Sequence, residues 1–509
     1  RRVNPMAGPR KPFAHLARDF TASIVVFLVA MPLCMGIAIA SGVPPEMGLV
    51  TGIIGGIVVG FLAGSPLQVS GPAAGLAVIV FEFVRDHGLS ALGPMLILAG
   101  LLQVAAGVLR LGGLFRSISP AVVHGMLAGI GALIVIGQFH ILFDAKPLSN
   151  GLENIAAMPA RILGLSPFDV RATELALIIG LLTIVAMLGW EKLRPSSLAL
   201  VPGALIGVSA ATLAAYVLGL EIARVTVPES ISSAFILPGN GFFTPLLEPG
   251  ILLAAVAVAF IASAETLLSA AAVDRMHDGV RTDYNKELRA QGVGNLLCGA
   301  AGGLPMTGVI VRSSANVQAG ARTRLSTIFH GIWILGFVAL LPGLLREIPM
   351  AALGGVLVVT GWRLVSIDHV RHLLHVHGRL PALIWLVTFA LVIATDLLTG
   401  VLVGLALSLL ELLPYRRSLR LGVAEQHEED VTHVTLKGTA TFLSLTRLNS
   451  VLESLPHDRS VRLDLGALKG MDHTTAQTLS EWLARRKKGG AHVEVSGPDD
   501  IVRPLAAAA

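Results

Sequence analysis

Charged side chains are scarce in this sequence. They make up 14% of its 509 residues, whereas soluble domains average about 25%. The two cysteines, Cys34 and Cys298, lie in apolar segments, so neither a disulfide framework nor a thiolate metal site is expected. No G-x-x-x-x-G-K-[ST] loop and no H-E-x-x-H pair occurs. We therefore expect no primary pump, no enzyme, no cofactor and no bound metal.

Apolar residues are abundant instead. They make up 54% of the chain, and the mean hydropathy is +0.75, which is typical of a polytopic membrane protein. Two of the fourteen apolar segments, 73–84 and 312–321, are shorter than the roughly 20 helical residues that cross a bilayer. The segments are 20–42, 46–63, 73–84, 90–110, 120–142, 173–190, 198–218, 250–273, 288–304, 312–321, 325–341, 350–362, 381–395 and 397–413.

The order of these segments predicts a mostly α membrane protein built from two inverted repeats. Seven segments precede residue 250 and seven follow it, and an odd number per repeat inverts the second copy. A small cytoplasmic α/β domain follows. The predicted parts are a cytoplasmic segment 1–18, a transmembrane domain 19–415 with repeats at about 19–220 and 250–415, a linker 416–430 and a tail domain 431–505.

Lys and Arg gather in the loops on the side of the N-terminus and are sparse on the other side. The positive-inside rule therefore predicts that both ends are cytoplasmic. The net charge of +5 is small for this length, so these cations predict topology rather than binding of nucleic acid.

The tail alternates strand and helix patterns. Strands are expected at Val431–Leu436, Val461–Leu465 and His492–Val495, with an amphipathic helix over Thr475–Lys488. This order is typical of an α/β domain with a mainly parallel sheet.

Arg312 lies in a stretch whose other residues are typical of a membrane-spanning segment. A cation near the centre of a bilayer costs roughly 2.5–3.5 kcal/mol on insertion scales, so it needs a compensating role. Val69–Ala73 and Val311–Ala315 align at an offset of 242 residues, and each follows a run of helix breakers. Paired, interrupted segments of this kind indicate the binding site of a transporter. Arg312 is expected to attract the anion from beside the second helix start. Alternatively, it holds the two half-helices together through backbone carbonyls.

We expect two half-helices that begin near the bilayer midplane, at Gly71–Pro72 and at Ser313–Ser314. Each helix start offers unpaired N–H groups and about half a positive charge, so two facing starts form an anion site. Pro72 suits a first-turn position. The extended pieces 67–70 and 307–311 must pair with each other or line a cavity. Alternatively, the glycines and prolines only kink continuous helices.

Glu265 is the second intramembrane charge, well inside the segment 250–273. A proton on this carboxylate would cancel its repulsion of a nearby anion, which is the logic of symport. A static ion pair between Glu265 and Arg312 is the alternative. Hydroxyls of Ser263, Ser313 and Ser314 could donate to an anion, although single serines more often pack helices.

Several motifs together resemble a bacterial member of the SulP family of anion permeases. They are Val69–Gly75, Glu265–Ser269, Thr282–Leu288, Arg312–Asn316 and the tail, which resembles a STAS domain. The resemblance implies that segments 1–4 and 8–11 form a transport core and that segments 5–7 and 12–14 form a gate. It also implies a homodimer and elevator-like motion.

The resemblance also implies a set of residues around the substrate. Glu265 is implied as the coupling position. The first apolar segment, which carries a proline in its middle, is implied to line the cavity. By the residues alone, Pro32 kinks the helix and Phe27 is as well explained by packing. The residues expected at the anion are Phe27, Pro32, Leu33, Gly71, Pro72, Ala73, Ala74, Gly75, Ser263, Arg312, Ser313, Ser314 and Ala315.

Other polar residues have more ordinary interpretations. His124, Gln138 and His140 are expected to be packing residues rather than a proton relay. Asp396 is expected to cap a helix. The histidines between 369 and 377 lie in a charged loop with loose spacing, which does not favour a metal site.

In the tail, 471–475 takes the place of the STAS helix-start motif. Thr474 matches its phosphorylatable position, but Thr475 replaces the glycine. Docking of a cytoplasmic partner is therefore preferred over regulation by phosphorylation.

The sequence predicts a secondary-active transporter of a small anion, either sulfate, bicarbonate or a dicarboxylate, coupled to protons. An anion exchanger and an uncoupled channel of the same fold remain as alternatives. Glu265 separates a symporter from a channel, because a passive pore gains nothing from a carboxylate beside an anion.

Overall fold

The computed structural model describes most of the chain. The described residues are 15–113, 119–143, 145, 147–148, 151–164, 170–198, 201–226, 235, 237–274, 276–277, 279–365, 367–372, 374, 379–395, 397–410, 421–427, 431–455, 460–488, 493–498, 501–502 and 505. By the density of internal contacts, the chain divides into two units, 1–112 with 133–362 and 113–132 with 363–509.

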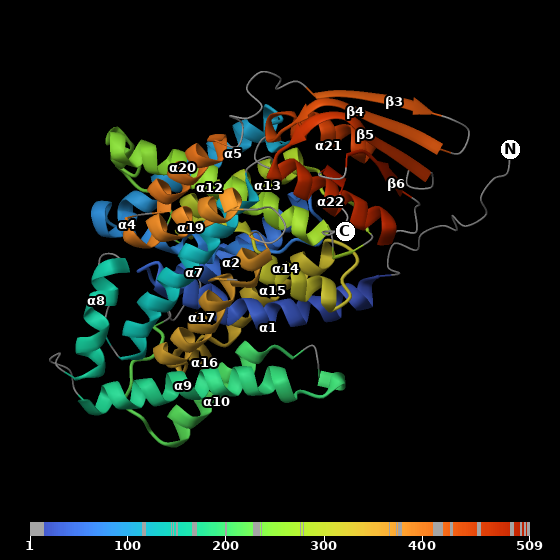
Figure 1. Cartoon of the computed structure of the whole chain (residues 1–509). Helices are drawn as coiled ribbons and strands as arrows, with labels where there is room; N and C mark the ends of the chain where they lie inside the picture. The colour runs from blue at the N-terminus through green and yellow to red at the C-terminus, as the bar shows by residue number, and fades with distance from the viewer. Residues whose placement is uncertain are drawn as a thin grey trace. The chain divides into compact units, whose positions relative to one another are not determined.

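The first unit is almost entirely helical (Figure 1). It holds two very short strands, β1 (Ser70–Pro72) and β2 (Met306–Gly308). Its helices are α1 (Leu16–Ala40), α2 (Pro45–Ile54), α3 (Gly60–Leu62), α4 (Ala74–His87), α5 (Leu92–Val108), the second half of α7 (Pro120–Leu142), α8 (Gly151–Ile162), α9 (Val170–Leu193), α10 (Gly203–Val217), α12 (Pro249–Asp274), α13 (Tyr284–Ala301), α14 (Ile310–Gln318), α15 (Leu325–Leu340), α16 (Pro342–Arg346) and α17 (Met350–Val365).

Six helices among the described residues are long and apolar enough to cross a membrane: Leu16–Ala40, Pro45–Leu62, Leu89–Val108, Pro120–Leu142, Thr173–Leu193 and Pro249–Asp274. Five shorter apolar helices accompany them, at Gly203–Val217, Leu325–Leu340, Met350–Val365, Arg379–Ala394 and Thr399–Ser408.

A π-helical turn, Gly55–Val59, interrupts the second of these spans. Glycine is required there, because a Cβ on Gly55 would lie 2.5 Å from the carbonyl oxygen of Ser70. A Cβ on Gly56 would lie 2.5 Å from the Cα of Gly331. The turn is therefore wedged between β1 and α15, and π-helical turns of this kind are frequent at functional sites.

The strands β1 and β2 pair antiparallel, with Gly71 opposite Thr307. Backbone at membrane depth must be hydrogen-bonded within the protein. The side chain of Asn295 brackets Met306, because its Oδ1 accepts from Met306 N at 2.7 Å and its Nδ2 donates to Met306 O at 3.2 Å. Thr266 Oγ1 accepts from Gly308 N at 3.1 Å. Of the two alternatives for the extended pieces, pairing with each other or lining a cavity, the structure shows pairing, at 70–72 and 306–308 rather than at 67–70 and 307–311.

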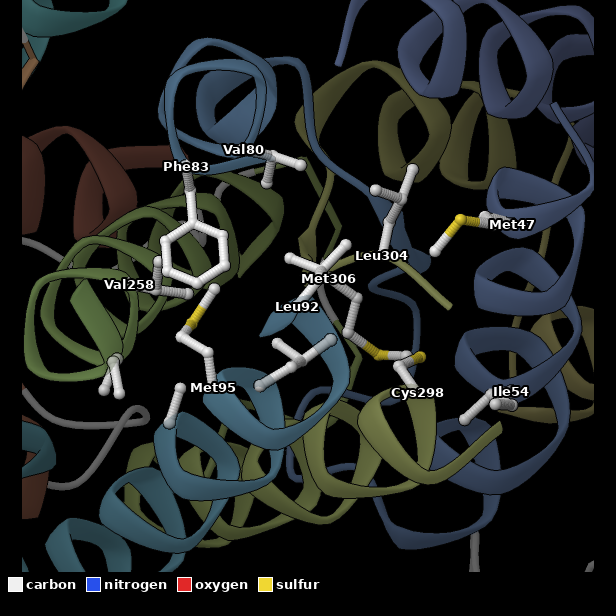
Figure 2. Close-up of a cluster of buried hydrophobic side chains, with 14 of the residues drawn as sticks. Met47, Ile54, Val80, Phe83, Leu92, Met95, Val258, Cys298, Leu304 and Met306 are labelled. Atoms are coloured by element: carbon white, nitrogen blue, oxygen red, sulfur yellow. The ribbon is translucent and has the colours of Figure 1, made fainter. Parts of the chain in front are cut away.

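One hydrophobic cluster surrounds this strand pair. Met306 of β2 lies in it close to Cys298 of α13, with Val80 and Phe83 of α4 and Met95 of α5 in the same cluster (Figure 2). Burial of apolar helix faces against this strand stabilises the interrupted span. The gain in free energy is about 25 cal/mol for each Å² of apolar surface removed from solvent.

The second unit contains the first half of α7, α18 (Ile367–His372), α19 (Arg379–Ala394), α20 (Leu397–Ser408) and the tail. A Cβ on Gly125 of α7 would lie 2.7 Å from the carbonyl oxygen of Trp385, so α7 and α19 pack in close backbone contact. Asp396 lies outside the described residues, so its predicted cap is not observed.

The tail is an α/β domain with a four-stranded sheet in the order β3-β4-β5-β6. The strands β4 to β6 are parallel, as predicted, and β3 pairs antiparallel with β4. The prediction missed β3, because its residues were assigned to the linker. The elements are β3 (Leu421–His427), β4 (Val431–Ala440), α21 (Leu445–Ser454), β5 (Ser460–Met471), α22 (His473–Lys488) and β6 (Val493–Ser496).

Candidate functional site

The paired strands bring the N-termini of two short helices, α4 and α14, close to each other. The helix α4 follows β1 directly and α14 follows β2 directly, with Ala73 and Val309 as their N-cap residues in extended conformation. Because the strands run antiparallel, the two helices leave the pair in opposite directions. Their first turns, with unpaired N–H groups and positive dipole ends, lie on the same short ladder.

The structure corrects the predicted helix starts and their alignment. Pro72 lies in β1 rather than in the first turn of a helix, and α14 begins at Ile310 rather than at Ser313–Ser314. The starts Ala74 and Ile310 are 236 residues apart, so the offset of 242 was wrong by six residues. Ala73 and Ala74 therefore occupy the start of α4, whereas Arg312 to Ala315 lie within α14.

Arg312 is the largest fully buried side chain of the described residues. It lies in the first turn of α14, where side chains lean back toward the helix start. Its guanidinium lies over Gly71, since a Cβ there would be 2.1 Å from NH1. It donates one long hydrogen bond of 3.5 Å to Pro72 O, and Nε and NH1 have no partner among the described residues. The cation is therefore held between the two helix starts with free donors.

Glu265 of α12 faces the start of the other half-helix. A Cβ on Gly75 would lie 2.5 Å from its Oε2, so the carboxylate lies against the first turn of α4. Its Oε2 is buried and has no hydrogen-bond partner among the described residues. No ion pair joins Glu265 to Arg312, both of which the structure describes, so the alternative of a static pair is not formed.

The candidate serines are mostly engaged elsewhere. Ser313 Oγ donates to Val309 O at 2.7 Å and accepts from Val69 N at 2.9 Å. Ser263 Oγ donates to Ala259 O at 2.6 Å and accepts from Gln103 Nε2 at 3.1 Å. In this conformation both hydroxyl hydrogens are committed to backbone carbonyls, which is the helix-packing role that the sequence analysis also considered. Ser314 Oγ accepts from Gln318 at 2.9 Å.

Phe27 and Pro32 of α1 lie on a different cavity. It measures about 500 Å³ and is lined by α1, α10, α16 and the end of α15, with Phe337 packed against Phe27 at 5.6 Å between ring centroids. None of its lining residues belongs to α4 or α14. Leu33 is buried in α1 and does not line this cavity. The helix α1 also packs against α14 and α4, so the place of these three residues at the anion stays a prediction.

The structure adds anchoring residues that the sequence did not single out. Gln103 and Asn295 are joined at 2.7 Å, and Asn295 holds Met306. Thr51 Oγ1 accepts from Leu304 N at 2.7 Å, and Asn316 Nδ2 donates to Leu67 O at 3.0 Å. A lone amide or hydroxyl in an apolar helix gives no sign that its partner is a broken strand, so only their polarity could have drawn attention.

Gly75 offers a direct test of where Glu265 must lie. We expect Gly75→Ala to lower transport roughly tenfold or more, equivalent to about 1.4 kcal/mol, because the new methyl displaces the carboxylate. The fold should persist, since alanine favours a helix interior by up to about 1 kcal/mol over glycine. Uptake into proteoliposomes and the midpoint of thermal unfolding measure the two effects.

Gly336→Ala is the matched control. Gly336 lies in α15, and a Cβ there meets nothing within 4 Å. It should leave uptake unchanged. Equal losses in both variants would show that helix rigidity, rather than the position of Glu265, is responsible.

In the tail, Asp472 directly precedes α22 and fastens it. Its Oδ1 accepts from Thr475 N at 2.9 Å and its Oδ2 from Phe442 N at 2.6 Å. Burial of this carboxyl raises its pKa, against the opposing effect of these hydrogen bonds. Thr474 is only 2% exposed, so its hydroxyl is closed to a kinase in this conformation.

The remaining polar residues are placed as follows. His140 is buried and hydrogen-bonded, as expected for a packing residue. Gln138 is buried as well, and His124 has an interaction partner. His375 and His377 lie outside the described residues. No group of three or more metal-ligating side chains occurs among the residues described.

Comparison with known proteins identifies the architecture. The model of the sulfate permease family matches residues 16–388, well over half of the chain. The chain belongs to the sulfate permease family. A model of the STAS domain of the Mlab type matches residues 423–509. The chain is thus an anion transporter of the sulfate and bicarbonate class, and not an enzyme.

Two relatives illustrate the range of similarity. YvdB of Bacillus subtilis, a candidate sulfate transporter by its name, is 29% identical over 503 residues, covering 94% of this chain and 91% of YvdB. The bicarbonate transporter BicA of Synechocystis sp. is 28% identical over 409 residues, covering 77% of this chain and 69% of BicA.

Two solved structures share the fold. The transmembrane domain of a cyanobacterium bicarbonate transporter BicA aligns with a TM-score of 0.65 at 24% identity, covering 78% of this chain and 98% of that one. SLC26A9 aligns with a TM-score of 0.69 at 16% identity, covering 97% and 86%. The chain therefore has a mostly helical membrane transporter fold followed by an α/β STAS domain.

Proposed function

We propose that this protein carries a small anion together with a proton, by alternating access. One observation carries the proposal: the helices α4 and α14 begin on the same strand pair, beside a buried cation and a partly buried carboxylate that do not pair with each other. Charges are retained inside a membrane protein for function, because each is costly there.

The anion binds between the two helix starts. Arg312 supplies the full positive charge, and its Nε and NH1 lack partners among the described residues. The first turn of α14 is open, because Ile310 is 38% and Val311 46% exposed. Gly71 and Gly75 leave the space that the two charged side chains occupy, since a Cβ would lie 2.1 Å from Arg312 NH1 at Gly71 and 2.5 Å from Glu265 Oε2 at Gly75. Arg312 and the two helix starts together provide unpaired donors for a negatively charged solute.

The proton binds to Glu265. The ionised carboxylate lies against the first turn of α4 and competes with the anion for the same positive end of the helix. Protonation removes both the competition and the like-charge repulsion. Anion and proton therefore enter the site together, which couples the two gradients.

The proposed membrane domain consists of two inverted repeats. The spans divide seven and seven, from α1 to α10 and from α12 to α20, with α4 and α14 as the half-helices of the inverted repeats. Segments 1–4 and 8–11 form a core that moves in an elevator-like way against a gate. The protein is a homodimer in the plasma membrane of a bacterium, with both termini and the STAS domain, which can dock a partner, in the cytoplasm.

The substrate is tested with a panel of labelled anions. Purified protein in liposomes is offered sulfate, bicarbonate and the dicarboxylate fumarate, each with and without an outside-acid pH gradient. Symport predicts accumulation above equilibrium that collapses when a protonophore removes the gradient.

Two other outcomes would replace the proposal. Uptake that needs a trans anion and ignores the pH gradient would identify an exchanger. Uptake that stops at electrochemical equilibrium and ignores both would identify a channel.

A further inference from the structure

The helix α8 presents an apolar face that no described part of the chain covers. It lies between α7 and α9 in the sequence. Leu152 is 52%, Ile155 42% and Ile162 63% exposed. Their spacings of three and seven residues place them on one side of the helix.

The opposite side of α8 is fastened to the end of α7 through His140. Asn154 and Arg161, seven residues apart, both contact this ring. His140 Nε2 lies 3.1 Å from Asn154 O, and Arg161 Nε lies 3.3 Å from His140 Nδ1. Because Arg161 can only donate, Nδ1 accepts and Nε2 carries the hydrogen. The amide of Asn154 also brackets the backbone of Leu148, at 2.8 and 3.2 Å.

The direction of α8 differs from that of the spans around it. In Figure 1, α1 and α9 run in a common direction, whereas α8 runs across it. With 12 residues, α8 is also too short to span. A helix placed at the ends of spans and crossing their direction lies in the plane of the membrane surface.

The neighbouring surface is one that lipid must cover. The helix α9 is a span by length and composition and exposes an apolar stripe that repeats every three to four residues. The stripe comprises Ile178, Leu181, Leu182, Val185 and Leu188. The apolar side chains of α8 are as exposed as those of this stripe, at 42–63%.

We propose that α8 is an interfacial helix whose face of Leu152, Ile155 and Ile162 inserts into the lipid surface, so that His140 ties the end of α7 to a fixed depth. Apolar side chains on one face and a polar opposite face are the pattern of such helices. The charges of α8, Glu153 and Arg161, balance, so insertion needs no anionic lipid.

Site-directed nitroxide labelling of the full-length protein in vesicles tests this proposal. The two native cysteines are buried, so single cysteines introduced at Ile155, Ile162 and Leu152 take the label. Collisions with oxygen, which concentrates in lipid, are compared with those of a water-soluble nickel chelate. We expect the labels at these sites to favour oxygen several-fold over the chelate. Glu153→Cys, on the polar flank of the same helix, is the matched control and should favour the chelate.

The lipid composition of the vesicles distinguishes apolar insertion of α8 from electrostatic attraction to anionic lipid. Phosphatidylcholine alone should give the same result as phosphatidylcholine with phosphatidylglycerol. Three outcomes overturn the proposal: labels at Ile155 and Ile162 as open to the chelate as the control, insertion only with the anionic lipid, or protection from both reagents with spin–spin broadening. The last would show that a second copy of the chain covers this face.

Discussion

Arg312→Ala is expected to reduce anion uptake by more than 100-fold while the protein stays folded. Removal of the side chain leaves only the partial charges of two helix starts at the site. A loss of that size corresponds to about 2.7 kcal/mol of binding or barrier, within the range of charge-assisted interactions and the desolvation they involve.

Arg312 is also expected to lower the stability of the folded protein. Its Nε and NH1 are buried without partners among the described residues, and its hydrogen bond to Pro72 O is long. Replacement by a residue of similar size, Arg312→Met, removes a buried charge that costs roughly 2.5–3.5 kcal/mol on insertion scales. The midpoint of thermal unfolding should therefore stay or rise while uptake is lost, the usual opposition of stability and activity at a site.

Arg312→Lys separates charge from shape. The ammonium keeps the charge but loses the planar fork, so uptake should be intermediate and its apparent KM raised. Arg281→Ala, a change in the segment just beyond the end of α12, controls for loss of an arginine as such. Near-normal uptake by a folded Arg312→Ala would falsify the placement of the anion.

Glu265→Gln is expected to separate anion movement from the proton gradient. Glutamine keeps the size of the side chain and mimics the protonated state, so the anion should still enter the site. Counterflow of labelled against unlabelled anion should persist. Accumulation driven by an outside-acid gradient should fall to the equilibrium level, because no group at the site then takes up and releases a proton.

The measurement is steady-state accumulation in proteoliposomes, with and without a pH gradient, beside counterflow in the same preparation. Glu221→Gln, a change of the same kind at an exposed acid in the segment between the repeats, should behave as the unaltered protein. Full gradient-driven accumulation by Glu265→Gln would contradict the assignment of the coupling proton.

Much of the membrane fold could be predicted because the residues that interrupt its helices are local signals. Glycine and proline runs before β1 and β2 mark the two breaks. Their recurrence in both halves predicted two extended pieces that either pair with each other or line a cavity, and the structure shows that they pair. The parallel strands of the tail were predicted from alternation, and the burial of Val434 and Leu436, two residues apart on β4, confirms that alternation.

The positions of the helix starts could not be predicted, for physical reasons. Ser313 resembles an N-cap in sequence, but its hydroxyl accepts from Val69 N on the other interrupted span. Pro72 resembles a first-turn residue, but it occupies the end of a strand, where a missing N–H is tolerated. In both cases the partner lies more than 200 residues away, and no local pattern identifies it.

The cross-pairing of β1 with β2 also bears on how the protein is made. When the ribosome has produced Ser70–Pro72, the segment that will complete its ladder is more than 230 codons away. During that interval the peptide groups of the first break have no complement, and hydrocarbon cannot supply one. The nascent first half must therefore wait in a hydrated or chaperoned setting, and separately synthesised halves should be unable to mature alone.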